Sequence, residues 1–224
     1  MSKSKQVTEE PKKSLDELET VSPKKKLGAR DRNRASLIRA AQRCLINTGP
    51  NVTIEYFAEF AEVSPATIYK HFHHKDDMFA EALGSFYVDW LVWANEVIRE
   101  QTTDPLSEFI LPLRLLARLK KTHPEFAAAV VNSSTNLSFI TRALAETAEA
   151  HYLSLVKSGV LPSDNTDVRF LLVTNAGLGF FLAVLRNEYE PSGNLLEDFE
   201  LLFGILGVSK AKLKKIISIP LDAK

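Results

Sequence analysis

Apolar residues recur at helical spacing along most of the chain. Between Asp31 and Asn47 they form one stripe, at i, i+3 or i+4 and i+7, which predicts an amphipathic helix. The members of this stripe are Leu37, Ile38, Ala41, Cys44 and Leu45. Gly49 and Pro50 end the helix. No segment alternates with a period of two, so the pattern predicts an all-α fold.

Two helix starts then follow each other closely. Thr53 is a typical N-cap residue, and an apolar pattern from Ile54 to Ala61 follows it. Ser64 followed by Pro65 is a second start, with a capping hydroxyl and a proline at the first helical position. Only two residues remain for the turn between these helices. Residues 53–72 are therefore predicted to form a helix-turn-helix.

Helical signals continue to the end of the chain. A long helix is expected from Lys75 to about Gln101, and Asp104-Pro105 starts the next, which Pro112 should kink or divide. His123-Pro124 starts a short helix to about Asn132. Ser133-Ser134-Thr135 starts the next helix, which Gly159 stops, and Ser163 or Asp164 caps the one after it. Asn194 forms a capping box with Glu197 at the start of the last long helix, which Gly207 stops.

The segment from Phe170 to Leu185 is apolar on nearly all sides. A membrane span is one interpretation, but the segment is short for one, and Arg169 and Arg186 flank it. A core helix and a subunit interface are the favoured interpretations, and they are compatible. Small residues at Ala176, Gly177 and Gly179 would allow another helix to approach closely.

Charge is distributed unevenly, although the 224 residues have a formal net charge of zero. Residues 1–75 carry 14 Lys and Arg against 9 Asp and Glu, whereas residues 76–224 carry 14 against 19. A basic N-terminal third fits a nucleic-acid-binding head on a body with another role. The sequence shows no signal peptide, and the single cysteine excludes an internal disulfide, so we expect a cytoplasmic protein.

The stretch from Val63 to Phe79 holds the candidate chemistry. A metal site at His71, His73 and His74 is disfavoured, because their spacing does not place them on one helical face. Asp76 and Asp77, which follow Lys75, suit the first turn of a helix better than general acid–base catalysis. No catalytic residue, metal or cofactor is expected.

A nucleic-acid-binding interpretation accounts for the whole stretch. The small residues Ser64, Pro65, Ala66 and Thr67 would let the second helix enter the major groove of DNA. Tyr69, Lys70, His71 and Lys75 would contact the phosphate backbone, while Ile68 and Phe72 face inward.

Residues from about Asn33 to Leu83 resemble the DNA-binding domain of the TetR family of transcriptional regulators. The segment TIEYFAEFAEVSPATIYKHFHHKDDMF carries the resemblance, with its threonine-started helix, Val-Ser, and Thr-Ile-Tyr-Lys-His-Phe followed by a lysine and acids. Two departures stand out. Glu62 replaces the usual glycine of the turn, and His73-His74 replace a turn former and a small cap.

This resemblance implies a homodimeric repressor that binds a palindromic operator and responds to a small molecule. It assigns DNA-facing positions to Thr53, Ser64, Thr67, Tyr69, Lys70, His71 and Lys75. The expected domains are a disordered tail (1–28), a DNA-binding domain of three helices (29–89) and a helical domain for ligand binding and dimerisation (90–224). A constitutive DNA-binding protein, and a helical enzyme or carrier fused to a DNA-binding head, remain alternatives.

Candidate residues in the C-terminal domain follow from residue type and helical position. An apolar or amphipathic effector is expected at Trp90, Trp93, Phe126, Tyr152 and Asn175. The dimer interface is expected in the helices near 164–188 and 194–207, at Ala176, Gly177, Phe180 and Phe203. The long helix from Lys75 is expected to connect the effector to DNA, and the protein to act at the nucleoid.

Overall fold

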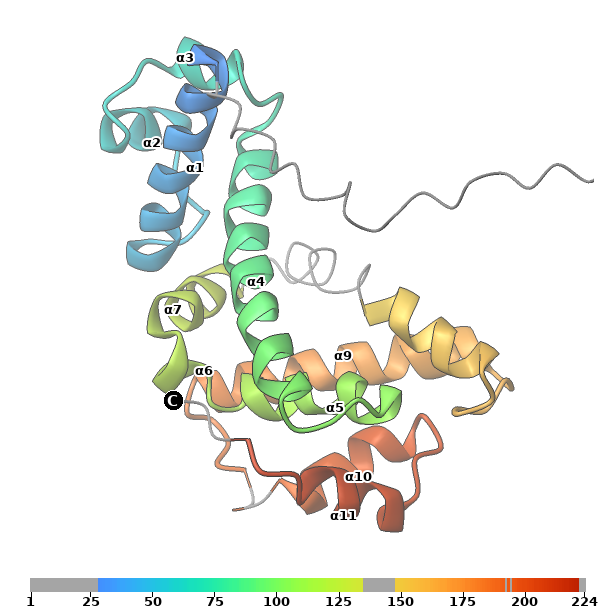
Figure 1. Ribbon diagram of the computed structural model, residues 1–224. Coiled ribbons are helices and arrows are strands. Elements are labelled where there is room, and N and C mark those ends of the chain that lie inside the picture. Colours follow the sequence, from blue (N-terminus) through green and yellow to red (C-terminus); the bar gives the residue numbers. More distant parts are fainter. Residues whose placement is uncertain (1–27, 135–147, 192, 194, 222–224) are drawn as a thin grey trace, which may run out of the picture.

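The computed structural model describes residues 28–134, 148–191, 193 and 195–221, and within these residues the chain is helical without strands (Figure 1). The helices are α1 (Ala29–Asn47), α2 (Ile54–Phe60), α3 (Pro65–Tyr69), α4 (Lys75–Arg99), α5 (Pro105–Leu116), α6 (Leu119–Thr122), α7 (Pro124–Ser133), α9 (Thr166–Leu185), α10 (Leu196–Gly204) and α11 (Lys210–Ile217), with a further helical stretch over 148–157. The all-α prediction is confirmed. The tail up to residue 27 and the predicted start at Thr135 lie outside the described residues.

The head comprises α1, α2, α3 and the first turns of α4. Helices α2 and α3 begin where the sequence predicts, because side chains satisfy their first backbone N–H groups. Thr53 accepts a hydrogen bond from the backbone N–H of Tyr56, and Ser64 accepts one from that of Thr67. Between these caps Glu62 takes a left-handed conformation, with φ at +56°. The turn thus keeps a backbone shape that favours glycine, although its residue is a glutamate.

Helix α4 joins the head to the body as one continuous element of 25 residues (Figure 1). The domain boundary expected after residue 89 falls inside this helix. His74 occupies the N-cap position of α4 but makes no side-chain capping bond. Helix α1 packs against both α4 and α7, so the head also touches the body away from α4.

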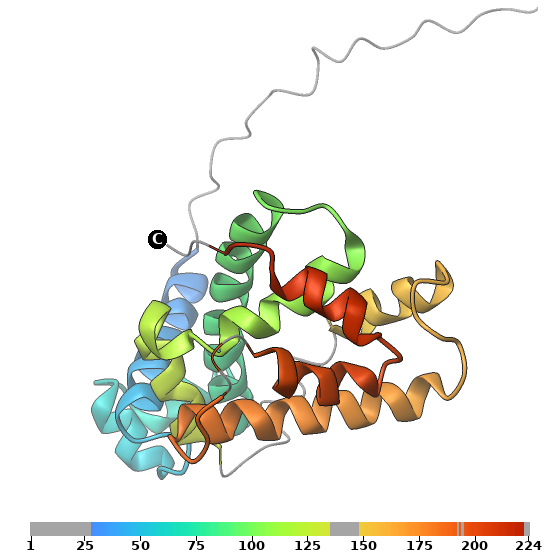
Figure 2. The same cartoon turned by 90° about the horizontal axis from the view of Figure 1, so that it is seen from below.

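The body is a set of helices that cross the lower half of α4. Helices α5 and α9 lie across the end of α4, and α10 and α11 lie beyond them (Figure 1); Figure 2 shows α9 running along one side of the body. Trp90, Phe199 and Phe203 are among the largest side chains that are fully buried. Their burial follows from the apolar faces of α4 and α10, which meet in one core with α9.

Pro112 was expected to kink or divide its helix, and α5 runs through it without a break, after a start capped by Asp104 as expected. Helix α9 begins one or two residues later than predicted, after Asn165, whose φ is +51° and whose side chain makes no cap. The next helix runs to Gly204, and Gly207 stops it as predicted: the N–H groups of Gly207 and Val208 donate to the carbonyls of Gly204 and Phe203, and the φ of Gly207 is +79°.

The final helix, α11, was not predicted, although Ser209 caps it by accepting a bond from the N–H of Lys212. Close packing is a second reason for glycine at position 207, because a Cβ there would lie 2.7 Å from Cγ of Pro162. The predicted capping residue Asn194 lies outside the described residues.

Candidate functional site

The short helix α3 presents a small, polar first turn to solvent. Ser64, Pro65 and Ala66 are exposed, and Thr67 is half-buried. The hydroxyls of Ser64 and Thr67 lie 2.9 Å apart and share a hydrogen bond. The turn therefore carries two hydroxyls and almost no bulk, a surface that can approach base edges closely.

The end of α3 and the residues that follow it separate inward from outward side chains. Ile68 and Phe72 are buried, as expected from their spacing of four residues. Tyr69 keeps 52% of its surface exposed, and Lys70 is also exposed. His71 is half-buried, and its Nδ1 is a buried atom with no hydrogen-bond partner in the described part of the chain.

Thr53 and Lys75 each make a contact within the head. The exposed Thr53 caps α2, so its hydroxyl already accepts a backbone N–H. The ammonium of Lys75 donates to the carbonyl oxygen of Val52 at 2.5 Å. Lys75 therefore ties the start of α4 to the loop before α2, and its charge is half-buried.

Two arginines of α1 lie beside α3 and were not singled out from the sequence. Arg39 and Arg43 line a shallow hollow together with Thr67 of α3. Both arginines are exposed. Their helical spacing of four residues, off the apolar stripe of α1, was the signal that could have identified them. They extend the polar surface of α3 with positive charge.

Arg34, in contrast, has a structural role. Its guanidinium forms a bidentate ion pair with Glu81 of α4, and this pair raises the pKa of Arg34. The same guanidinium lies 4.6 Å from the ring centroid of Phe72. Arg34 thus holds α1, the end of α3 and α4 in one arrangement.

A cavity of about 260 Å³ lies in the body between α4, α5, α7, α9 and the helical stretch over 148–157. Its walls are mostly apolar and rich in aromatic rings. The aromatic lining residues are Tyr87, Trp90, Phe109, Phe126, His151, Phe170, Phe181 and Phe203. A concave, largely apolar space with few polar groups is the usual form of a small-molecule site.

Few polar side chains reach this cavity. Asn95, Glu108, Tyr87 and His151 line it and make no hydrogen bond within the described residues, whereas the hydroxyl of Thr174 donates to the carbonyl of Phe170. Burial raises the pKa of Tyr87 to about 12, so its hydroxyl stays protonated and can donate. The sequence pointed to His151 as a polar candidate and to Tyr87 as an aromatic one, but not to Asn95 or Glu108, because nothing in the local pattern separates these two from ordinary surface polar residues.

The predicted ligand residues divide into two groups. Trp90 and Phe126 line the cavity, with ring centroids 6.4 Å apart. Trp93 instead packs edge-on against His123, at 4.6 Å between ring centroids. Asn175 is exposed, and its amide donates to the carbonyl of Leu171. Tyr152 is fully buried behind the cavity wall and stacks on Phe170, which lines the cavity.

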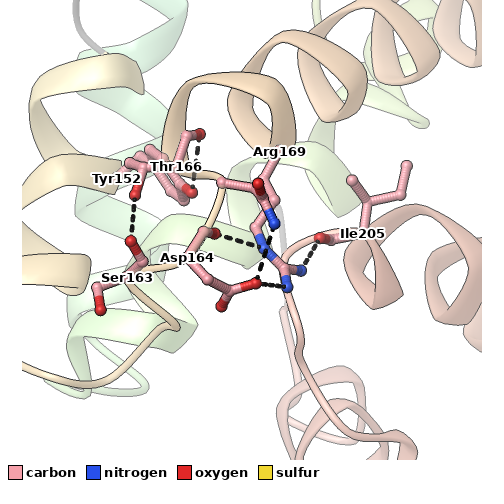
Figure 3. A network of polar contacts seen from close by, with 7 residues as sticks. Tyr152, Ser163, Asp164, Thr166, Arg169 and Ile205 are labelled. Carbon is pink, nitrogen blue, oxygen red and sulfur yellow. Dashed lines mark hydrogen bonds and ion pairs between the residues drawn. The ribbon is translucent and has the colours of Figure 1, made fainter.

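A polar network fixes the start of α9 beside the cavity (Figure 3). The guanidinium of Arg169 donates to the carbonyl of Ile205 at 2.5 Å and to the carboxylate of Asp164 at 2.8 Å. The hydroxyl of Tyr152 donates to the carbonyl of Thr166 at 3.2 Å. These bonds hold the far wall of the cavity where α9 has no side-chain cap.

The two faces of α9 differ sharply. Val173, Gly177 and Phe181 are buried on the inner face, and the Cα of Gly177 faces the methyl groups of Leu202. The outer face exposes apolar side chains: Val168 is 55%, Leu171 60% and Leu172 51% exposed.

The other residues expected at a dimer interface are also divided. Ala176 and Gly179 lie on the exposed face of α9, while Phe203 of α10 is fully buried within the chain. Phe180 is half-buried and packs edge-on against Phe181. Leu201 of α10 is 81% exposed and extends the apolar surface.

Helix α9 is long and apolar enough to cross a membrane by length and composition alone. Its inner face nevertheless packs in the body and lines the cavity, which accounts for the apolar residues on that side.

The end of α7 connects the body to the head. The amide of Asn132 donates to the carbonyls of Leu45 and Ile46 at the end of α1, at 3.1 and 2.8 Å. Gly49 approaches so closely that a Cβ there would lie 2.6 Å from the carbonyl oxygen of Asn132. Two residues further along, Ser134 accepts a hydrogen bond from Arg186, which follows α9. We call the contact of Asn132 with α1 the junction clamp.

Comparison with known proteins identifies the head. Residues 37–82 match the family described as bacterial regulatory proteins, tetR family. The fold resembles the crystal structure of RolR in complex with the ligand resorcinol, with a TM-score of 0.63 and 18% identity over 86% of this chain and 96% of that chain. It also resembles RolR without ligand, with a TM-score of 0.60 and 19% identity over 84% and 97% of the two chains. No curated protein sequence matches the chain.

Proposed function

We propose that this chain, whose residues 37–82 match the tetR family of bacterial regulatory proteins, is a transcriptional regulator and a ligand-responsive repressor. It binds a palindromic operator as a homodimer in the cytoplasm, at the nucleoid, and releases it when a small molecule enters the cavity. One observation carries this proposal. A single helix, α4, is fixed to the head at one end and forms a wall of the cavity further along.

The DNA-binding surface is α3 with its neighbours on α1. The hydroxyls of Ser64 and Thr67 face the bases, and Tyr69 and Lys70 contact phosphates on one side. Arg39 and Arg43 supply positive charge on the other side. Because these contacts neutralise phosphates and release counterions, operator affinity falls steeply as salt concentration rises.

The outer face of α9 forms the dimer interface together with α10. Side chains as exposed as Leu172 and Leu201 leave apolar surface uncovered on α9 and α10, and a second copy covers it. Exposed small residues at Ala176 and Gly179 let the two helices approach closely. Two-fold symmetry then places two α3 helices one DNA turn apart, about 34–36 Å.

The cavity controls DNA binding through α4. Near its start, Lys75 and Glu81 hold α4 to the head through Val52 and Arg34. About 22 Å along the helix, at 1.5 Å per residue, Trp90 lines the cavity. A ligand can change operator affinity only to the extent that it binds one orientation of α4 more tightly than another. A coupling of about 1–3 kcal/mol corresponds to a change of roughly 5–150-fold.

The cavity also favours this proposal over the constitutive alternative. A DNA-binding protein without an effector gains stability by filling its interior, because an empty space forfeits packing contacts. The remaining alternative, an enzyme or carrier, calls for clustered reactive groups. Within the described ranges, no three or more His, Cys, Asp and Glu side chains could together hold a metal ion.

The proposal is tested by selecting a duplex from a random library and measuring its affinity for the full-length protein. Replacing Tyr69 and Lys70 together by Ala should weaken binding to every sequence by at least about tenfold and should reduce the salt dependence. Replacing the exposed Tyr189 and Lys212 of the body by Ala is the matched control and should leave binding unchanged. Thr67→Ala should alter sequence preference more than affinity.

Equal operator affinity for the Tyr69 and Lys70 double variant and the wild type would refute this placement of the DNA-binding surface. Reciprocity supplies a test of the effector role, because an effector that weakens operator binding must itself bind more weakly, by the same factor, to the operator complex. A ligand of the cavity with the same affinity in both states would favour the constitutive alternative.

A further inference from the structure

We infer that the cavity selects a hydrophobic amine, a ligand with an aromatic body of about two fused rings and one protonated nitrogen, and discriminates against anions. This inference rests on the proposed role of the cavity as an effector site. It goes further because it specifies the charge, size and contact point of the ligand.

The charge of the cavity wall favours a cationic ligand. Glu108 of α5 lines the cavity, is half-buried, and forms no ion pair or hydrogen bond through its carboxylate within the described residues. No lysine or arginine is among the described lining residues. A carboxylate beside apolar walls is costly unless a charge or a donor compensates it, and a protonated amine does both.

The backbone of Glu108 adds a second acceptor. Pro112, which also lines the cavity, stands four residues after Glu108 within α5. Proline has no N–H, so the carbonyl oxygen of Glu108 lacks its usual helical donor. A ligand group with several N–H donors can compensate an acceptor-rich wall better than a hydroxyl with one donor.

Aromatic rings line the cavity together with Glu108. Phe109 follows Glu108 in the chain and packs edge-on against His151, with 5.4 Å between ring centroids. Phe170 of α9 also lines the cavity, and both Phe109 and Phe170 pack against Tyr152. The negative faces of aromatic rings attract cations, so this lining adds to the preference for an ammonium.

The size of the ligand follows from the volume. An apolar cavity of about 150 Å³ holds benzene, so the cavity of about 260 Å³ has room for two fused rings. Apolar side chains such as Leu119 and Leu185 make up most of the remaining lining, and they accommodate the ring system while the amine lies at Glu108.

The test uses calorimetry on the full-length protein with three naphthalenes that share one skeleton: the naphthylmethylammonium ion, naphthylmethanol and naphthoate. The ammonium should bind about tenfold more tightly than the alcohol, since a charge-assisted hydrogen bond is worth about that factor. Naphthoate should bind most weakly. In Glu108→Gln, the preference for the ammonium should fall to within about twofold of the alcohol.

Two controls keep the outcomes distinct. Glu149→Gln, at an exposed glutamate that does not line the cavity, should retain the full preference. The uncharged fluorescent probe phenylnaphthylamine should bind to the wild type and to both variants, which shows that the cavity is intact.

Tightest binding of naphthoate, or an ammonium preference that survives Glu108→Gln, would overturn the inference and leave the proposed effector role standing. If the alcohol and the probe bind but the ammonium gains nothing over the alcohol, the same conclusion holds. If none of the three naphthalenes nor the probe binds, the cavity is not an effector site, and both the proposed function and this inference fail.

Discussion

The head and the body of this molecule present opposite kinds of recognition surface. In the head, Ile68 and Phe72 fill the interior so that Tyr69 and Lys70 project outward. In the body, residues of the interior surround a cavity and are themselves the candidate binding surface. One chain can therefore use tight packing in its head to define an outer binding surface, and incomplete packing in its body to define an inner one. Each region should therefore respond differently to substitution.

The largest effect is expected where the body joins its partner. Leu172→Glu places a charge on the outer face of α9 and should convert the dimer to a monomer. Operator affinity should then fall by roughly 100- to 10,000-fold, because two linked half-site contacts become one. Native mass measurement and operator binding would test this. Val92→Glu, at a similarly exposed valine of α4, is the control and should remain dimeric. A dimeric Leu172→Glu protein would place the interface elsewhere.

A comparison of two truncations tests the difference in packing. Phe57 of the head is fully buried and packs edge-on against Phe79, so Phe57→Ala should cost about 3–5 kcal/mol of unfolding free energy. Phe170 is half-buried and already borders empty space, so Phe170→Ala should cost only about 1–2 kcal/mol. Urea unfolding followed by circular dichroism measures both. Equal costs would mean that the body is packed as tightly as the head.

The junction clamp tests whether head and body are independent. Asn132→Ala removes two hydrogen bonds to the end of α1 and should cost about 1–2 kcal/mol. Hydrogen exchange should also become faster at the end of α1. Gln101→Ala removes an exposed amide just after α4 and is the control, with an expected cost below about 0.5 kcal/mol. Unchanged exchange in Asn132→Ala would show that α4 alone joins the two regions.

The smallest effect is expected at the turn of the head. Glu62→Gly relieves a left-handed backbone that costs about 1–2 kcal/mol for a residue with a side chain. Glycine loses more freedom on folding, which offsets about 0.5–1 kcal/mol, so the net gain should be about 0.5 kcal/mol. Glu59→Gly, inside α2, should instead destabilise the protein by about 1 kcal/mol. Thermal unfolding of both variants would establish the sign.

Much of the head could be predicted from the sequence because its signals are local. Thr53, Ser64 and Pro65 start helices through bonds to the next few residues, so the residue types suffice. The role of Lys75 could not be predicted in this way. Its ammonium bonds to Val52, which lies 23 residues earlier and approaches only in the folded chain.

The body was predictable as helices but not as a site. In α9 nearly every residue is apolar, so periodicity could not separate the inner face of Gly177 from the outer face of Leu172. The start of α9 was also misplaced, because Asn165 takes a left-handed conformation and Arg169 supplies bonds from inside the helix. Likewise, nothing local distinguished Glu108 from an ordinary solvated glutamate.

The sole cysteine of the chain, Cys44, can report how often the head opens. Cys44 is fully buried, its sulfur lies 3.3 Å from the hydroxyl of Thr48, and burial raises its pKa. An alkylating reagent can therefore reach the thiol only during transient openings of the head, and the labelling rate counts those openings. The measurement needs no engineered label. If the operator or an effector stabilises the closed head, labelling should become slower, and if it destabilises the closed head, labelling should become faster.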